Sequence, residues 1–126
     1  MTAIADTDAV SRPRVRLAAG LVSGAWDRGV AVFKGIPFAA PPVGALRFRA
    51  PGPVPAWDGV RDTVTFGPPP PQAAAFGMDR QARNAGDDRG WLTINVWTPD
   101  PSSGAGLPVM VWIHGGAYSI GTSSLP

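Results

Sequence analysis

The chain of 126 residues has room for one domain, and its 44% hydrophobic and 16% charged residues are typical of a globular protein rather than a disordered one. It contains no cysteine and one histidine, which excludes disulfides and a thiolate metal site and argues against zinc. The formal net charge is only +2 and no apolar run approaches the length of a membrane span, so neither nucleic acid nor a membrane is an expected partner.

Residues 1–17 are predicted to form a flexible N-terminal arm, followed by one folded portion that covers residues 18–126. The arm carries the one tight basic cluster, Arg12, Arg14 and Arg16. We interpret this cluster as a solvated arm or strand edge, with a nucleic-acid contact as the alternative. Residues 1–10 lack the apolar core of a signal peptide, and with the absence of cysteine this predicts a cytoplasmic protein.

Two β-rich segments are predicted, Val15–Trp26, which overlaps the end of the arm, and Val30–Lys34. Asp27-Arg28-Gly29 between them predicts a hairpin turn. The prolines of residues 35–48 forbid a regular helix or a central strand, so this stretch is expected to run extended over a surface. Residues 54–71 are expected to continue in the same way, without a regular helix or a central strand.

The next stretch, Ala73–Ala85, is the one modest helix candidate. Beyond it, Leu92–Thr98 alternates apolar and polar residues, except at Trp97, which predicts a half-buried strand. After a loop, Val109–Ile113 is apolar on both faces and is therefore predicted to be a strand buried in the middle of a sheet. A parallel partner would need a crossover of a dozen or more residues, so the sheet is expected to be incomplete.

The apolar run Val109–Ile113 stops at two glycines, Gly115 and Gly116, followed by Ala117. A strand that ends in a glycine turn can expose backbone N–H groups at its tip. Such donors stabilise the oxyanion that forms when an ester or amide carbonyl is attacked. The tip of this run is therefore a candidate anion site for acyl transfer.

Three blocks in this order resemble the N-terminal part of the type-B carboxylesterases, the family of the para-nitrobenzyl esterases and cholinesterases. The blocks are residues 33–48, 92–99 and 107–118. The resemblance implies that the fold class is α/β and that the chain forms the N-terminal part of an α/β-hydrolase fold. It also implies hydrolysis of a small-molecule carboxylic ester by a serine acyl-enzyme mechanism, without a cofactor or metal.

The resemblance also implies roles for residues of the third block. The backbone N–H groups of Gly116 and Ala117 would be two oxyanion donors, Gly115 would shape the turn, and Tyr118 would border a substrate pocket. The nucleophile, the acid and the base, together with the third donor, are expected beyond Pro126. The segment alone is therefore expected to be inactive.

Two residues near the glycines offer alternatives for the catalytic groups. His114 is interpreted as a structural group that orients the loop, with a general base as the alternative. Ser119 lies in an Ala-x-Ser-x-Gly sequence that imitates a nucleophile elbow, but the elbow needs a helix directly after the serine. Residues 121–126 are a poor helix start.

Two other functions remain open at this point. The chain is alternatively part of a catalytically inactive, cholinesterase-like interaction protein, or a truncated product without function. A Gly-x-Ser-x-Gly sequence after the next strand would separate the enzyme from the interaction protein.

Overall fold

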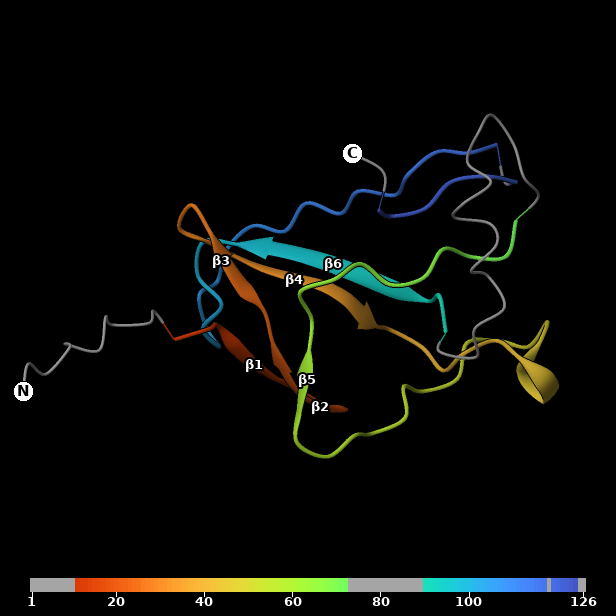
Figure 1. The fold of residues 1–126 in the computed structure, drawn as a ribbon, viewed down its shortest axis with the longest axis horizontal. Coiled ribbons are helices and arrows are strands. Elements are labelled where there is room, and N and C mark those ends of the chain that lie inside the picture. Colours follow the sequence, from red (N-terminus) through yellow and green to blue (C-terminus); the bar gives the residue numbers. More distant parts are fainter. Residues whose placement is uncertain (1–10, 73–89, 118, 125–126) are drawn as a thin grey trace, which may run out of the picture.

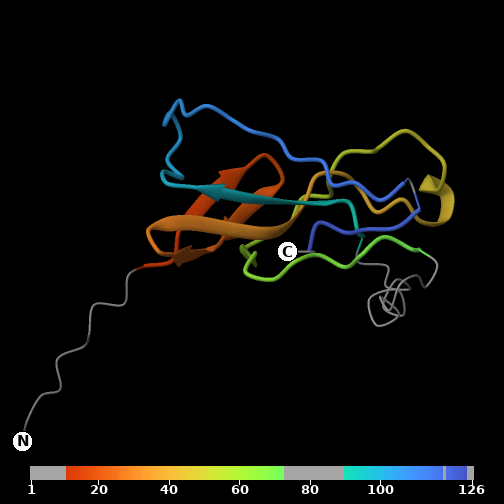
Figure 2. The ribbon, with the colours of Figure 1, turned by 90° about the horizontal axis from the view of Figure 1, so that it is seen from above.

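Six short strands form two three-stranded sheets in residues 11–72, 90–117 and 119–124, the part of the chain that this computed structural model describes (Figure 1). The strands gather at one end of the molecule, and loops extend toward the other end (Figures 1 and 2). The predicted helix at residues 73–85 lies outside the described residues.

The first sheet has the order β1-β2-β5. Strands β1 (Arg14–Leu17) and β2 (Gly20–Ser23) are antiparallel, and β5 (Val60–Asp62) runs parallel to β2. The prediction of a flexible arm over residues 1–17 is therefore wrong for β1. The alternation of β1 explains this, because Val15 and Leu17 pack against the core while Arg14 and Arg16 are exposed.

The second sheet has the order β3-β4-β6, with all neighbours antiparallel. It consists of β3 (Ala25–Asp27), β4 (Val30–Pro37) and β6 (Thr93–Thr98). The predicted hairpin is confirmed: Arg28 and Gly29 both have positive φ, 48° and 81°, as a two-residue turn that matches the strand twist requires. Strand β6 is half-buried, as its alternation predicts.

The apolar core lies where the two sheets face each other. Its buried members are Val22 of β2 and Ala31, Phe33 and Ile36 of β4. Trp57 covers this core and donates a hydrogen bond from Nε1 to the carbonyl of Leu21 at 3.0 Å. The core therefore depends on strands that are close in sequence and on one aromatic side chain from the proline-rich stretch.

The proline-rich stretch that follows β4 in the sequence is mostly extended, as its prolines predict, but it contains two short elements. One is a 3-10 turn, η1 (Gly44–Leu46), and the other is β5, which the sequence does not indicate. All three residues of β5 are exposed, so its sequence carries no burial pattern. Its pairing with β2 is what makes it a strand.

The prediction of a buried central strand at Val109–Ile113 is wrong. The run belongs to neither sheet and appears as an irregular blue trace in Figures 1 and 2. Its five side chains are between 71% and 90% exposed. A strand needs a neighbour to pair its backbone groups, and within the described residues no strand pairs with this run.

Candidate functional site

The residues after the apolar run fold into a tight turn, which we call the glycine loop (residues 114–117 and 119–121). The backbone N–H groups of Ser119 and Ile120 both donate to the carbonyl of Gly116, each at 3.0 Å. Gly116 has a φ of 143° and Ala117 a φ of 51°. The loop therefore turns back on itself directly after the two glycines.

The turn requires the absence of a side chain at Gly116. A Cβ built there would lie 1.7 Å from the carbonyl oxygen of Ile120, a distance that no side chain can occupy. At Gly115 a Cβ would meet nothing within 4 Å. The two glycines are thus not equivalent, and Gly116 is the one that the geometry demands.

The two candidate donors belong to peptides whose carbonyls are held from the other side. The Gly116 carbonyl, which accepts from Ser119 and Ile120, shares a planar peptide with the Ala117 N–H. The Gly115 carbonyl accepts from Nδ1 of His114 at 2.7 Å and shares its peptide with the Gly116 N–H. The described residues contain no cis peptide, so each N–H points away from the bonded carbonyl.

Neither amide already has a partner within the described part of the chain. No oxygen there accepts a hydrogen bond from the N–H of Gly116 or of Ala117. Gly116 is half-buried and Ala117 is exposed. Both groups can therefore serve an oxygen that comes from outside.

His114 and Ser119 do not form a nucleophile–base pair. The ring of His114 is turned onto its own loop, because Nδ1 donates to the Gly115 carbonyl, which can only accept. Ser119 is part of the turn, and residues 120–124 after it are not helical. The structure thus lacks the helix that a nucleophile elbow at Ser119 would need.

A hollow of about 650 Å³ lies between the glycine loop and the end of the proline run. Pro70, Pro71 and Gln72 line one side. Ile113 and the described residues of the glycine loop line the other side. This volume is in the range of small-molecule sites. Tyr118, the predicted pocket residue, lies outside the described residues.

Two carboxamides that the sequence analysis does not single out hold the chain after the turn. Gln72 bonds to both backbone groups of Gly121, and Asn95 of β6 donates to the carbonyl of Ser123. Both residues belong to segments that precede the glycine loop by many positions. Their position next to the loop follows from the fold, and the only signal in the sequence is that Asn95 lies within the second resembling block.

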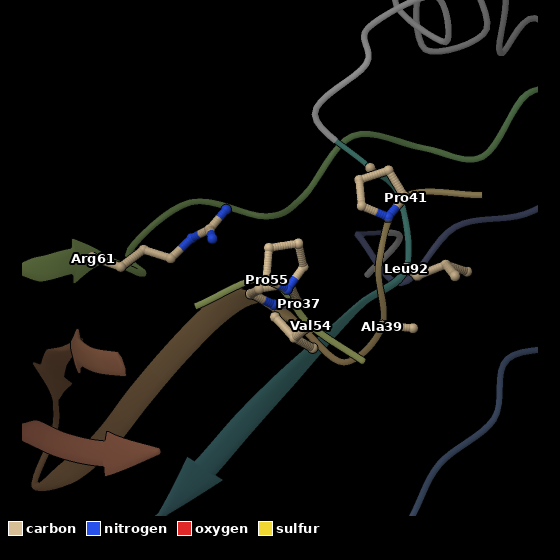
Figure 3. Close-up of a pocket in the computed structure, with 8 residues that line it drawn as sticks. Pro37, Ala39, Pro41, Val54, Pro55, Arg61 and Leu92 are labelled. Carbon is tan, nitrogen blue, oxygen red and sulfur yellow. The ribbon is translucent and has the colours of Figure 1, made fainter. Parts of the chain in front are cut away.

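A smaller cavity of about 110 Å³ has no residue of the glycine loop in its lining (Figure 3 shows the lining residues). It is lined mostly by prolines and aliphatic residues, and Arg61 of β5 extends along its edge. The guanidinium of Arg61 lies 5.0 Å from the centre of the Trp57 ring. The lining contains no nucleophile and no carboxylate, so this cavity offers no acyl-transfer chemistry.

Metal binding and membrane insertion find no support in the described ranges. No group of three or more histidine, cysteine, aspartate or glutamate side chains there could hold a metal ion. None of the helices described there has the length and apolar character needed to cross a bilayer.

Comparison with known proteins gives consistent matches along almost the whole chain. The model of the carboxylesterase family matches residues 11–125. Phenmedipham hydrolase of Pseudarthrobacter oxydans is 42% identical over 120 residues, which cover 93% of this chain and 24% of that protein. Para-nitrobenzyl esterase of Bacillus subtilis is 43% identical over 110 residues, which cover 85% of this chain and 22% of that protein.

The solved structures agree with the sequence matches. A carboxylesterase from Geobacillus stearothermophilus superposes with a TM-score of 0.75 at 40% identity, over 90% of this chain and 22% of that one. The chain therefore spans less than a quarter of the length of the proteins it matches.

Proposed function

Because the chain belongs to the carboxylesterase family, we propose that it forms the N-terminal portion of a serine esterase with an α/β-hydrolase fold. The complete enzyme hydrolyses small carboxylic esters through an acyl-enzyme, without a cofactor. In this proposal the glycine loop supplies two donors of the oxyanion hole, the N–H groups of Gly116 and Ala117. The resemblance identified from the three sequence blocks is confirmed by the family match.

The observation that carries the proposal is the orientation of the two amides. Both are without an acceptor in the described residues, and both belong to residues that line the hollow. Their carbonyl sides are fixed by His114 and by the turn, so they need no rearrangement when charge develops. Preorganised donors of this kind contribute most where negative charge appears in the transition state.

The chemistry divides between this segment and residues outside it. Attack of a serine hydroxyl on the ester carbonyl forms a C–O bond, places negative charge on the carbonyl oxygen and transfers the hydroxyl proton to a histidine. Collapse of this intermediate breaks the ester C–O bond and releases the alcohol with that proton. Gly116 and Ala117 act on the oxyanion, whereas the serine, the acid and the histidine are expected beyond Pro126.

A hybrid enzyme tests this proposal. Residues 11–125 of this chain replace the matched N-terminal portion of the Bacillus subtilis para-nitrobenzyl esterase, and hydrolysis of a para-nitrobenzyl ester is followed by release of the alcohol. We expect turnover by the hybrid and none by the 126-residue chain alone. In the hybrid, Gly116→Val keeps the backbone N–H but its side chain would displace the Ile120 carbonyl and misdirect the donors. We expect kcat to fall about 10²–10³-fold, as when an oxyanion donor is lost.

The outcomes separate the candidate functions. A folded hybrid without turnover, measured beside the active host enzyme, would contradict the proposal and favour an interaction protein. Turnover by the 126-residue chain that survives Gly116→Val would show that the site is wrong.

A further inference from the structure

We propose that Gln72 and Asn95 are positioning residues for the glycine loop, and that they act by holding its return limb (Gly121–Ser123). This inference rests on the proposed function for its catalytic consequence. Its structural part stands on hydrogen bonds among described residues. Neither side chain lies at the amides that would contact substrate, so both act through the backbone between them.

Gln72 pairs with Gly121 in both directions. Its Oε1 accepts from the Gly121 N–H at 2.8 Å, and its Nε2 donates to the Gly121 carbonyl at 3.0 Å. The carboxamide thus bonds to Gly121 as one residue of an antiparallel strand pair bonds to the residue opposite it, through one donor and one acceptor. The Nε2 also donates to the carbonyl of Pro70 at 3.3 Å, which ties the carboxamide to the proline run.

Asn95 connects the other end of the return limb to the second sheet. Its Nδ2 donates to the Ser123 carbonyl at 3.3 Å, and its Oδ1 accepts from the N–H of Gly35 at 2.9 Å. Gly35 lies where the register of β4 and β6 shifts, which leaves its N–H available to a side chain. Between the two attachment points, Thr122 is buried at 4% exposure.

The return limb transmits this restraint to the proposed donors. Ile120, next to Gly121, donates to the carbonyl of Gly116, and its own carbonyl fills the space where a Gly116 side chain would be. The Gly116 carbonyl in turn sets the direction of the Ala117 N–H. A shift of Gly121 would therefore rotate the peptide that carries one oxyanion donor.

Two substitutions of similar volume separate hydrogen bonding from packing at Gln72. Gln72→Met keeps the bulk but removes both hydrogen bonds to Gly121. In Gln72→Glu the carboxyl can reproduce both bonds only when it is protonated, because the carboxylate is an acceptor alone and faces the Gly121 carbonyl. That arrangement favours the neutral form, so the pKa of the introduced carboxyl should lie above its ordinary value.

The first measurement is the set of amide chemical shifts of Gly116, Ala117 and Gly121 in the 126-residue chain, by NMR over a pH range. We expect Gln72→Met to move all three signals at every pH. Gln72→Glu should match the unmodified protein at low pH and depart from it as the carboxyl ionises. The unmodified protein is titrated in parallel, so that responses common to both proteins cancel.

Thr63→Val is the matched control. It removes a buried hydrogen bond of ordinary length, from the Thr63 hydroxyl to the Ser23 carbonyl at 3.0 Å, in the first sheet. It should leave the three loop signals in place. Loop signals that respond to Thr63→Val as strongly as to Gln72→Met, or a Gln72→Glu variant without pH dependence, would overturn the inference.

The second measurement is kinetic and uses the hybrid enzyme. Gln72→Met and Asn95→Leu should each lower kcat about tenfold to a hundredfold with a smaller change in KM, because a misdirected donor is felt mainly in the transition state. Thr63→Val should not. An unmodified hybrid without activity overturns the proposed function. The NMR result still decides whether Gln72 holds the return limb. An active hybrid in which both variants keep full kcat overturns the inference.

Discussion

At the scale of single residues, the glycine loop combines two features. One position has no room for a side chain, and two peptides are held in place by hydrogen bonds to their carbonyl groups. The sequence could indicate Gly116 and Ala117, because two glycines after an apolar run are visible without a structure. It could not indicate the hydrogen bonds of Gln72 or Asn95. Carboxamides have no periodicity, and their partners are set by segments that meet only in the folded chain.

The close approach at Gly116 leads to the first prediction. Gly116→Ala should displace the Ile120 carbonyl and lower kcat of the hybrid at least about a hundredfold. Gly104→Ala is the control, since Gly104 also has a positive φ, 108°, but open space around it. Both variants carry backbone strain, and only the first should lose activity. Equal losses in the two variants would show that strain, rather than the clash, is responsible.

The hydrogen bond from His114 leads to the second prediction. His114→Phe keeps a ring but removes the donor to the Gly115 carbonyl, so the Gly116 N–H loses its restraint. We expect kcat of the hybrid to fall about tenfold or more, with little change in the pH at which activity is half-maximal. A pH profile that loses its acidic limb would instead identify His114 as a general base, because a base must be unprotonated to act.

Asp100 offers a prediction about pH. The side-chain and backbone hydrogen bonds from Ser102 hold the pKa of Asp100 below its ordinary value of 3.8. A lowered pKa stabilises the fold above the ordinary value, and this contribution disappears as the pH falls through the lowered pKa. Ser102→Ala should raise the pKa of Asp100, as measured by NMR titration of the carboxyl carbon. Ser103→Ala should leave it unchanged.

At the scale of elements, the sequence predicts strands best where local pattern and turn chemistry agree. The hairpin of β3 and β4 and the alternation of β6 could be predicted for this reason. β5 could not, because three exposed residues take their conformation from the parallel pairing with β2. Most of β1 lies in the predicted β-rich segment Val15–Trp26, so the arm predicted over residues 1–17 is too long at its end.

The junction between β1, β2 and β5 leads to a prediction on stability. Arg12 donates to the carbonyls of Ser23 and Gly24 and forms an ion pair with Asp62 of β5. Arg12→Met should lower the free energy of unfolding by about 1–2 kcal/mol, measured by urea denaturation. Arg14→Met is the control, since no described residue accepts a hydrogen bond from the exposed Arg14 side chain. A change below the experimental error would show that solvent screening cancels the pair.

At the scale of the whole molecule, the apolar run Val109–Ile113 stands apart from both sheets. Its composition predicts a segment that avoids water, but burial needs a covering surface, and composition does not supply one. The described chain leaves these side chains exposed. Contiguous exposed apolar residues of this kind promote association.

This exposure leads to a prediction for the 126-residue chain in solution. We expect concentration-dependent self-association by light scattering, and Val111→Lys should reduce it by placing a charge in the run. Phe48→Lys is the control, because Phe48 is 92% exposed but lies outside the run. If both variants reduce association equally, net charge rather than the apolar run is the cause.

The long separation between β4 and β6 has a consequence for synthesis on the ribosome. Gly35 and its partner Asn95 are 60 residues apart, so at roughly 5–20 residues per second β4 waits several seconds for β6 to emerge. The β1-β2-β5 sheet can close earlier in translation, once β5 has left the exit tunnel. During this interval the nascent hairpin of β3 and β4 presents an unpaired edge, which is where a chaperone would first be needed.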